Sequence, residues 1–233
     1  MNEPLLESLK TRVDSIRENV VKAAERCGRC PDEIKILAVS KTHPSELIRM
    51  AHQAGLRLFG ENRVQEAERK VQELRDLDLE WHLIGQLQTN KVKKALDLFR
   101  FIHSVDRPRL VNALEREAQL RQQTINIFLQ VNIGEEESKA GTSVDHFEEL
   151  LNSVQQTEFL HVLGLMTVPP FLDDPAQVRP YFQQLRELGE KYRADLVGNR
   201  RLELSMGMTH DYPVAIEEGA TILRIGTAIF GER

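Results

Sequence analysis

A regular alternation of short apolar runs with longer amphipathic stretches constrains the fold of this chain more than any other feature. The apolar runs carry few polar residues, which indicates strands buried on both faces, and strands alternating with helices indicate a parallel sheet. The expected strands cover residues 34–40, 56–60, 81–85, 101–105, 125–132, 161–166, 202–205 and 221–225. The expected helices between them cover residues 45–54, 62–74, 89–98, 108–121, 144–155, 174–192 and 209–219.

Eight such units in about 200 residues match the lower size range of a (β/α)8 TIM-type barrel. A doubly wound open sheet is the alternative, but the dinucleotide fingerprint G-x-G-x-x-G is absent. No linker rich in proline, glycine or serine divides the chain. The sequence therefore predicts an α/β protein with one domain over residues 1–233, in which residues 1–28 form an extra leading helix.

The overall charge and the terminal sequence exclude several classes of protein. A formal net charge of −5 argues against a general nucleic-acid-binding protein, which needs a basic face. No apolar run approaches the roughly 20 residues that span a bilayer, so no membrane association is expected. Residues 1–27 are amphipathic and carry acidic as well as basic groups, which fits neither a signal peptide nor a transit peptide. The expected location is the cytoplasm.

The two cysteines, Cys27 and Cys30, stand in the sequence CGRC at the end of the leading helix. A redox role would require a βαβ context that opens at the motif, and two thiols supply only half of a structural zinc site. We therefore expect two ordinary thiols and no metal site.

The sequence ILAVSKTHP, residues 36–44, places a lysine where the first expected strand ends. Burying an ammonium group costs several kcal/mol unless it is paired or neutral. Reactive groups of (β/α)8 barrels lie at the carboxyl ends of the strands. Lys41 occupies that position, and polar or glycine residues are expected at the same edge after the other strands. These residues are Glu61, Asn62, Gln86, Asn132, Thr167, Ser205, Gly207, Gly226 and Thr227.

Two of these turns follow the seventh and eighth strands, where barrels usually bind phosphate. Ser205 and Gly207 lead into a helix whose first N–H groups are unpaired, and Gly226 and Thr227 offer backbone and hydroxyl donors. Arg224 alternates with apolar neighbours and should point into the barrel mouth. A lysine with a phosphate cradle suits pyridoxal 5'-phosphate, but a barrel enzyme acting on a phosphorylated metabolite could use the same residues. Spacing alone leaves both alternatives open.

Several segments, in order along nearly the whole chain, resemble the pyridoxal phosphate homeostasis proteins of the YggS/PROSC group. The segments are ILAVSKTHP, FGENRVQEAERK, WHLIGQLQTNKVK, IHSVDRPRL, VNIGEEESKAG, GLMTVPP, LSMGMTHDYPVAIEEG and LRIGTAIFGER. This family is related to the barrel domain of alanine racemase, so the resemblance implies a fold-type III barrel without the second domain. CGRC carries no part of the resemblance.

The resemblance also implies roles for particular residues. Lys41 matches the lysine that forms a Schiff base with pyridoxal 5'-phosphate, and Arg224 matches the arginine that faces the pyridine nitrogen. The remaining matches are Ser205 and Gly207 on one side of the phosphate, Gly226 and Thr227 on the other, and Asn62 near the ring. An arginine stays protonated, so it would donate to the ring nitrogen and limit carbanion chemistry. His82 is expected to be a strand residue behind the site.

The function implied is cofactor binding in vitamin B6 homeostasis without catalysis, with no catalytic residue. The alternative is a pyridoxal-phosphate-dependent amino-acid racemase. Racemases of this fold use a second β domain, which is not expected here because the sequence ends at Arg233 after the eighth unit. They also use a catalytic tyrosine, and Tyr212, the only tyrosine expected near the strand ends, is not expected to be that base. Apo-enzymes that use the cofactor are the expected partners, and the expected state is a monomer.

Lys139, within EEESKAG, is a second candidate amine at which cofactor would dock transiently, although a solvated lysine beside glutamates is the simpler interpretation. Lys91, Lys93 and Lys94 are expected on an exposed helix face, where they would otherwise attract an anionic ligand.

Overall fold

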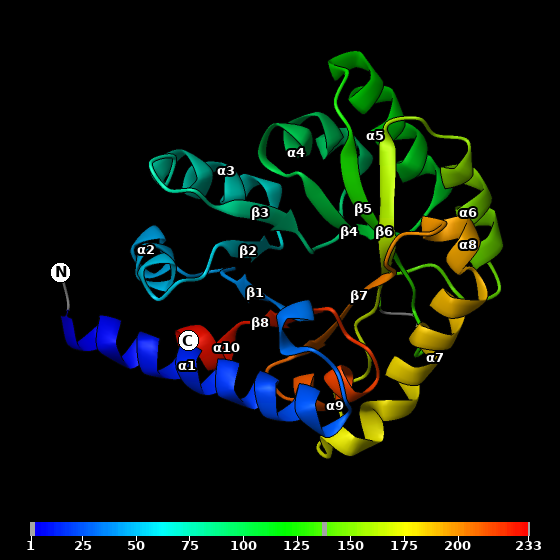
Figure 1. Cartoon of the computed structure of the whole chain (residues 1–233). Coiled ribbons are helices and arrows are strands. Elements are labelled where there is room, and N and C mark those ends of the chain that lie inside the picture. Colours follow the sequence, from blue (N-terminus) through cyan, green and yellow to red (C-terminus); the bar gives the residue numbers. More distant parts are fainter. Residues whose placement is uncertain (1–2, 137–138, 233) are drawn as a thin grey trace.

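Eight parallel strands form a closed barrel in the computed structural model, which describes residues 3–136 and 139–232. The strands follow one another around the barrel in chain order, and β1 pairs with β8 to close it (Figure 1). They are β1 (Lys35–Val39), β2 (Leu58–Glu61), β3 (Glu80–Leu83), β4 (Phe101–Val105), β5 (Ile125–Gln130), β6 (Leu160–Met166), β7 (Glu203–Met208) and β8 (Ile222–Ile225). This confirms the (β/α)8 barrel that the sequence predicts.

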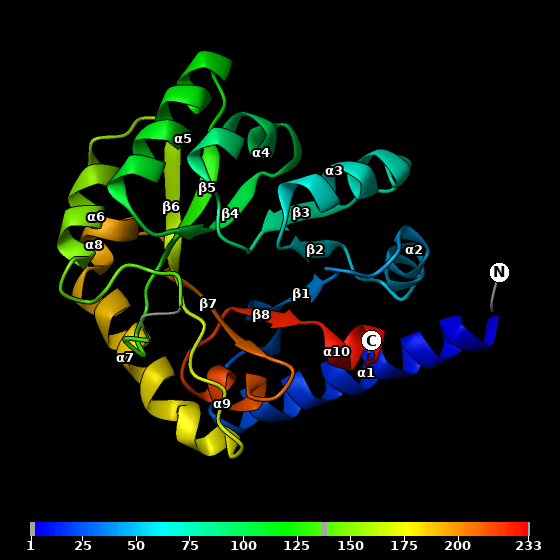
Figure 2. The ribbon, with the colours of Figure 1, turned by 180° about the vertical axis from the view of Figure 1, so that it is seen from behind.

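Helices surround the barrel, and the leading helix lies against the last ones, as both ribbon views show (Figures 1 and 2). The α-helices are α1 (Glu3–Arg26), α2 (Ser45–Gln53), α3 (Val64–Glu73), α4 (Val92–Leu98), α5 (Pro108–Arg121), α6 (Phe147–Gln155), α7 (Arg179–Lys191), α8 (Arg193–Val197), α9 (Tyr212–Glu217) and α10 (Thr227–Phe230). Three short 3-10 turns are η1 (Pro31–Glu33), η2 (Thr89–Lys91) and η3 (Pro175–Val178). The buried side of α1 repeats every three or four residues, which explains why this helix packs on α9 and α10. Its buried residues are Leu9, Val13, Ile16, Val20, Ala23 and Ala24.

The predicted helices and strands differ from the structure in several places. The helix expected over 174–192 is divided into η3 and α7, because Asp174 caps η3 and Pro180 restarts the helix within the first turn of α7. The short helices α8 and α10 were not expected, since five and four residues carry no periodic signal. Strand β7 extends to Met208, three residues beyond its predicted end.

The inside of the barrel is only partly apolar. Leu37, Phe128, Met166 and Ile222 form a small buried cluster there, separate from the large core between barrel and helices. Barrel interiors are usually filled by branched apolar side chains. Here buried His82, His103, Ser205 and Arg224 contribute as well, on strands β3, β4, β7 and β8. Hydrogen bonds connect these four side chains.

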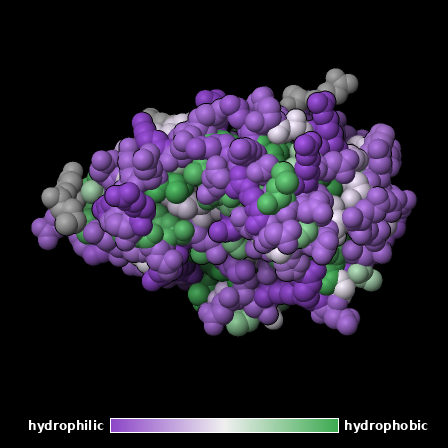
Figure 3. Space-filling view, turned by 90° about the horizontal axis from the view of Figure 1, so that it is seen from above, coloured by the Kyte–Doolittle hydropathy of each residue, from purple (hydrophilic) through white to green (hydrophobic). Residues whose placement is uncertain are grey.

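The surface is mainly hydrophilic in the view from above, with hydrophobic residues in small separate areas (Figure 3). The large hydrophobic side chains that are exposed lie far apart in the sequence, at Val21, Leu120, Val144 and Phe171. Within residues 3–136 and 139–232, no helix has the length and hydropathy needed to cross a membrane. The same residues contain no group of three or more His, Cys, Asp or Glu side chains placed to hold a metal ion.

Candidate functional site

The predicted site residues lie on neighbouring strands around one part of the barrel edge. Arg224 on β8 is in register with Met208 on β7 and with Leu37 on β1, and Val39 is in register with Gly60 on β2. Lys41, Asn62 and Gly226 therefore follow three consecutive strands, and Gly207 lies near the end of the next strand, β7. The closure of β1 onto β8 brings Lys41 close to the chain's last strand.

Lys41 begins a strained turn. Thr42 has φ of 66°, which is unusual for a residue branched at Cβ. Its backbone N–H donates to Glu66 Oε1 at 2.5 Å, and its hydroxyl donates to the carbonyl oxygen of Lys41 at 2.6 Å. Strained backbone of this kind persists only where the surroundings hold it, and it concentrates at functional sites. Lys41 is half-buried, and none of the described residues accepts a hydrogen bond from its amine.

A second lysine, fully buried, holds this turn in place. Lys70 on α3 donates to the carbonyl oxygen of Ser40 at 2.7 Å, to Glu61 Oε1 at 2.8 Å and to Glu66 Oε1 at 2.6 Å. The Ser40 hydroxyl also donates to Glu61 Oε1, at 2.6 Å. Lys70 thus connects the end of β1, the end of β2 and the carboxylate that binds Thr42.

The two carboxylates around Lys70 are affected differently. Desolvation raises the pKa of Glu61, although hydrogen bonds from Lys70 and Ser40 oppose the shift. Desolvation alone would also raise the pKa of Glu66. Hydrogen bonds from Lys70 and from the Thr42 backbone outweigh this effect, so the pKa of Glu66 is lowered. Glu61 Oε2 is buried and has no hydrogen-bond partner among the described residues. The ionised form of Glu66 is therefore well stabilised, whereas ionising Glu61 costs free energy.

The turn after β7 is shaped by a glycine and an aspartate. The β7–β8 register shifts between Ser205 and Met208, and Gly207 in this bulge has φ of 88°. The backbone N–H of Met208 donates to Asp211 Oδ1 at 2.6 Å. Burial raises the pKa of Asp211, against the effects of that hydrogen bond and of Arg224. Bulges of this type redirect the chain beside functional sites.

We expect Gly207→Ala to reduce the free energy of unfolding by about 2–4 kcal/mol, because strain at positive φ adds to overpacking. A Cβ at Gly207 would lie 2.6 Å from Cβ of Ala215. Gly28→Ala is the matched control, since Gly28 has φ of 68° but no atom within 4 Å of a Cβ there. Urea unfolding of both variants measures the difference. Equal losses would show that the close contact with α9 has no effect.

The turn after β8 lies against both β1 and the β7 turn. Gly226 precedes α10, and a Cβ at this position would lie 3.5 Å from the carbonyl oxygen of Val39. The backbone N–H of Ala228 donates to the hydroxyl of Thr209 at 3.3 Å, so the two glycine turns meet here. Thr227 is exposed at the start of α10.

Arg224 lies inside the barrel, buried beneath these turns. Its Nη1 donates to the carbonyl oxygen and the hydroxyl of Ser205, at 2.5 and 2.9 Å, and its Nη2 donates to the carbonyl oxygen of Thr167 at 2.7 Å. Desolvation lowers the pKa of Arg224 to about 10, so the guanidinium is charged at neutral pH. No described residue accepts a hydrogen bond from Nε. These contacts use three of the five N–H groups of the guanidinium, so the Nε–H and one Nη2–H remain for a ligand.

Ser205 and Asn62 occupy different environments within the site. The Ser205 hydroxyl is buried and hydrogen-bonded to Arg224 and His103, so it faces the barrel interior. Its place in a phosphate cradle stays a prediction. Asn62 is half-buried, its backbone packs against Gly85, where a Cβ would collide with the Asn62 carbonyl, and its side-chain amide has no described partner.

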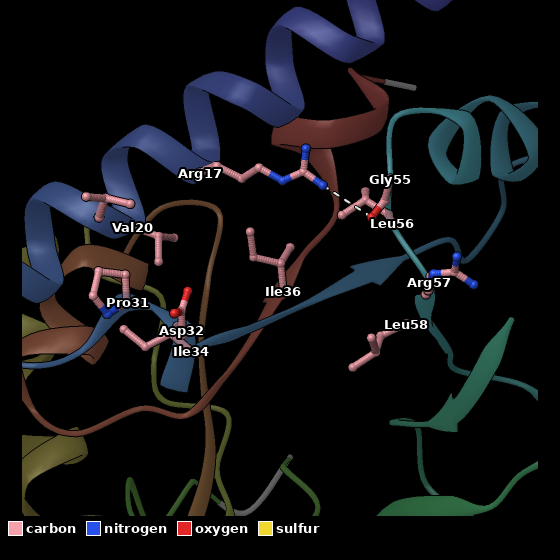
Figure 4. Close-up of a pocket in the computed structure, with 11 residues that line it drawn as sticks. Arg17, Val20, Pro31, Asp32, Ile34, Ile36, Gly55, Leu56, Arg57 and Leu58 are labelled. Atoms are coloured by element: carbon pink, nitrogen blue, oxygen red, sulfur yellow. Dashed lines mark hydrogen bonds between the residues drawn. The ribbon is translucent and has the colours of Figure 1, made fainter.

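Two hollows lie at opposite ends of the barrel. One of about 520 Å³ adjoins the Lys41 turn and is lined by Thr42, His43, Pro44, Arg63, Gln65, Glu66 and Arg69. The other, of about 400 Å³, lies where β1 and β2 begin, beside α1 (Figure 4). Arg17 extends across it and donates to the carbonyl oxygen of Gly55 at 3.2 Å, so its guanidinium is already engaged. Neither hollow is lined by Lys41, Arg224 or the glycines of the candidate site, so neither by itself marks where a cofactor would lie.

Other residues that the sequence singled out do not join the site. Lys139 is partly exposed but not free, because its amine donates to Glu136 Oε1 at 2.8 Å and to the carbonyl oxygen of Pro169 at 2.9 Å. Cys27 and Cys30 are exposed free thiols. Tyr212 is 7% exposed at the start of α9.

The sequence interpretation missed Lys70, His103 and Thr209. Lys70 lies within a charged helical stretch and resembles a surface residue, so only the structure reveals its burial. The burial of His103 was predictable, since it shares one face of an apolar strand with Phe101 and Val105. Thr209 stands within the predicted phosphate turn, two residues after Gly207.

Comparison with known proteins identifies the family. The model of the alanine racemase N-terminal domain matches residues 12–233. A pyridoxal phosphate homeostasis protein of Aquifex aeolicus is 47% identical over 223 residues, which cover 95% of this chain and 97% of that protein. The chain belongs to the pyridoxal phosphate homeostasis protein family. The member from Escherichia coli K12 is 38% identical over 222 residues, 94% of each chain.

Solved structures agree with this assignment. PipY of Synechococcus elongatus, described with pyridoxal phosphate bound, is 38% identical to this family member, with a TM-score of 0.84 over 96% of this chain and 100% of PipY. An alanine racemase from Clostridium difficile shares only the fold, at 12% identity and a TM-score of 0.71 over 97% of this chain and 57% of the racemase. The resemblance noted in the sequence is thereby confirmed.

Proposed function

We propose that this protein binds pyridoxal 5'-phosphate as a Schiff base on Lys41 and serves cofactor homeostasis without catalysing a reaction. The observation that carries the proposal is the bound cofactor of PipY, which is 38% identical and shares the barrel with a TM-score of 0.84. The proposal includes transfer of the cofactor to apo-enzymes, a monomeric state and a location in the cytoplasm.

The donor groups at the strand ends fit this cofactor. Lys41 supplies an amine without a described partner, and Arg224 supplies an N–H beneath the glycine turns. Gly226 and Thr227 open α10, and Gly207 lies in the bulge near the end of β7. Their backbone N–H groups and the Thr227 hydroxyl are the donors that the proposal assigns to the phosphate. Asn62 offers an unpartnered amide beside Lys41's strand.

When bound, the cofactor supplies a reactive aldehyde and a ring that accepts electrons. The protein residues favour holding it over using it. Arg224 has only N–H donors and is charged at neutral pH, so it would donate a hydrogen bond to the ring nitrogen without delivering a proton. The strained Thr42 turn, bound by Glu66, fixes the direction of Lys41.

The test is to add pyridoxal 5'-phosphate to the purified protein, record the absorption spectrum, reduce with borohydride and map the modified peptide. We expect a yellow protein with the adduct on Lys41, and no racemisation of alanine enantiomers by the same sample. A protein that takes up no cofactor would overturn the proposal in favour of a barrel acting on a phosphorylated metabolite. Racemisation would instead identify an enzyme.

A further inference from the structure

A chain of hydrogen bonds crosses the inside of the barrel and ends at Arg224. Glu80 Oε1 lies 2.9 Å from His82 Nε2, and His82 Nδ1 lies 2.8 Å from His103 Nε2. His103 Nδ1 lies 2.8 Å from the Ser205 hydroxyl, which accepts from Arg224 Nη1 at 2.9 Å. These groups belong to β3, β4, β7 and β8, so the chain connects the barrel end where β3 begins with the end that holds the candidate site.

The middle of this chain of hydrogen bonds is closed to water. His82 is 1% exposed and His103 is 0% exposed, whereas the Glu80 side chain is 45% exposed. His82 stacks on Phe101 and His103 stacks on Phe128, each with ring centroids 4.3 Å apart. Both imidazole rings are therefore fixed by packing as well as by hydrogen bonds. Buried polar networks specify one arrangement when every member is satisfied.

The groups at the two ends of the hydrogen-bond chain, Glu80 and Arg224, determine the direction in which each hydrogen bond is donated. A carboxylate only accepts and a guanidinium only donates. His82 Nε2 must therefore carry the hydrogen that faces Glu80, which leaves Nδ1 of a neutral ring as an acceptor. His103 Nε2–H then donates to it, and His103 Nδ1 accepts from the Ser205 hydroxyl. The Ser205 oxygen in turn accepts from Arg224.

The charges near the two rings agree with neutral imidazoles. Burial lowers the pKa of His82 despite Glu80, and burial together with His82 and Arg224 lowers the pKa of His103 well below its usual value. The hydrogen bond from His82 lowers the pKa of Glu80, which keeps this carboxylate ionised. Lys35 on β1 also faces His82 and opposes its protonation.

We propose that Glu80, His82, His103 and Ser205 form a one-directional hydrogen-bond relay that positions Arg224 as the donor at the base of the cofactor site. Glu80, His82 and His103 are positioning residues, because none of them lies at the strand ends beside Lys41, and Ser205 acts in this relay through its hydrogen bonds with His103 and Arg224. The relay exists without cofactor, whereas its effect on the ring nitrogen rests on the proposed function. Removing the relay should leave Arg224 less well held, so the ring nitrogen should take up a proton at higher pH.

The first test uses the cofactor-free protein and long-range 15N–1H NMR of its histidines. We expect His82 and His103 to be neutral with hydrogen on Nε2 from pH 8 to pH 5.5, and His82→Phe and His103→Phe assign the two signal sets. Hydrogen on Nδ1 of either ring, or a second proton on either at pH 6.5, would overturn the relay. This result is independent of whether pyridoxal 5'-phosphate binds.

The second test compares Ser205→Ala with Ser104→Ala, which removes another buried hydroxyl on the barrel, one that donates to the carbonyl oxygen of Gly85 at 2.7 Å. With pyridoxal 5'-phosphate bound, we expect Ser205→Ala to raise the pH midpoint of the spectral change by about one unit, the size expected from one hydrogen bond to a charged group. Ser205→Thr should restore the midpoint, and Ser104→Ala should leave it unchanged. Equal midpoints in Ser205→Ala and the wild type would contradict the role toward Arg224.

The relay also predicts a pH dependence of stability. A histidine whose folded pKa is lowered must stay neutral below about pH 6.5 while the unfolded chain takes up a proton. Stability therefore falls as pH decreases, by up to about tenfold in the folding equilibrium constant per pH unit for each histidine. Between pH 7 and pH 5, urea unfolding should show a shallower decline for His103→Phe than for the wild type. Parallel curves would show that His103 is protonated in the folded state.

Discussion

Lys41→Ala is expected to abolish the yellow, borohydride-sensitive form of the protein and to weaken pyridoxal 5'-phosphate binding by at least about a hundredfold, or about 2.7 kcal/mol. Only an amine forms a Schiff base with an aldehyde, and Lys41 is the lysine at the end of β1 beside the Gly226 turn. Absorption spectra during a cofactor titration measure both effects. The phosphate donors remain in this variant, so weak binding should persist.

Lys41→Arg distinguishes the effect of the positive charge at this position from the effect of Schiff-base formation. An arginine keeps the positive charge that attracts the phosphate but does not form a Schiff base. We expect this variant to bind cofactor reversibly and to lose it on dialysis. Lys139→Ala is the second control, because Lys139 is engaged by Glu136 and Pro169. An adduct that survives in Lys41→Ala and maps to another lysine would refute the assignment.

Lys70→Met is expected to reduce the free energy of unfolding by about 3–5 kcal/mol at pH 8, the range for removing one partner of a buried ion pair. Lys70 is 0% exposed and is the hydrogen-bond partner of Glu61, Glu66 and the Ser40 carbonyl. The methionine fills a similar volume but leaves the buried Glu61 carboxylate without its cation. Urea unfolding at several pH values measures the loss.

The pH dependence identifies the cause of that loss. The pKa of Glu61 is already raised by desolvation, and without Lys70 this carboxyl should protonate more readily. The defect should therefore shrink as pH falls from 8 to 5, and Glu61→Gln in the Lys70→Met background should recover part of the stability at pH 8. A defect that is equal at both pH values would assign the loss to packing instead. Lys70 also binds Glu66, which holds the Thr42 turn beside Lys41. Lys70→Met should therefore weaken cofactor binding as well.

Much of the site was predictable because it depends on local sequence. Lys41 follows an apolar run, and Gly226 stands in the turn after the eighth strand, where barrels often bind phosphate. Gly207 was predicted in the turn after the seventh strand and lies instead in a bulge near the end of β7. The prediction for Arg224 rests on strand alternation alone, and its contacts with Ser205 and Thr167 inside the barrel agree with it. The helix expected over 174–192 is divided because Asp174 caps η3 and Pro180 stands in the first turn of α7, and α8 and α10 were missed because they are too short for periodicity to register.

The sequence by itself determined the eight alternating units, the position of Lys41 at a strand end and the glycine turns, because these follow from patterns within a few residues. Only the tertiary structure decided that Lys70 is buried beneath the Lys41 turn and that His82, His103 and Ser205 lead to Arg224. The members of these clusters come from separate strands and helices. Their contacts depend on the stagger of neighbouring strands and on barrel closure, which no local pattern contains.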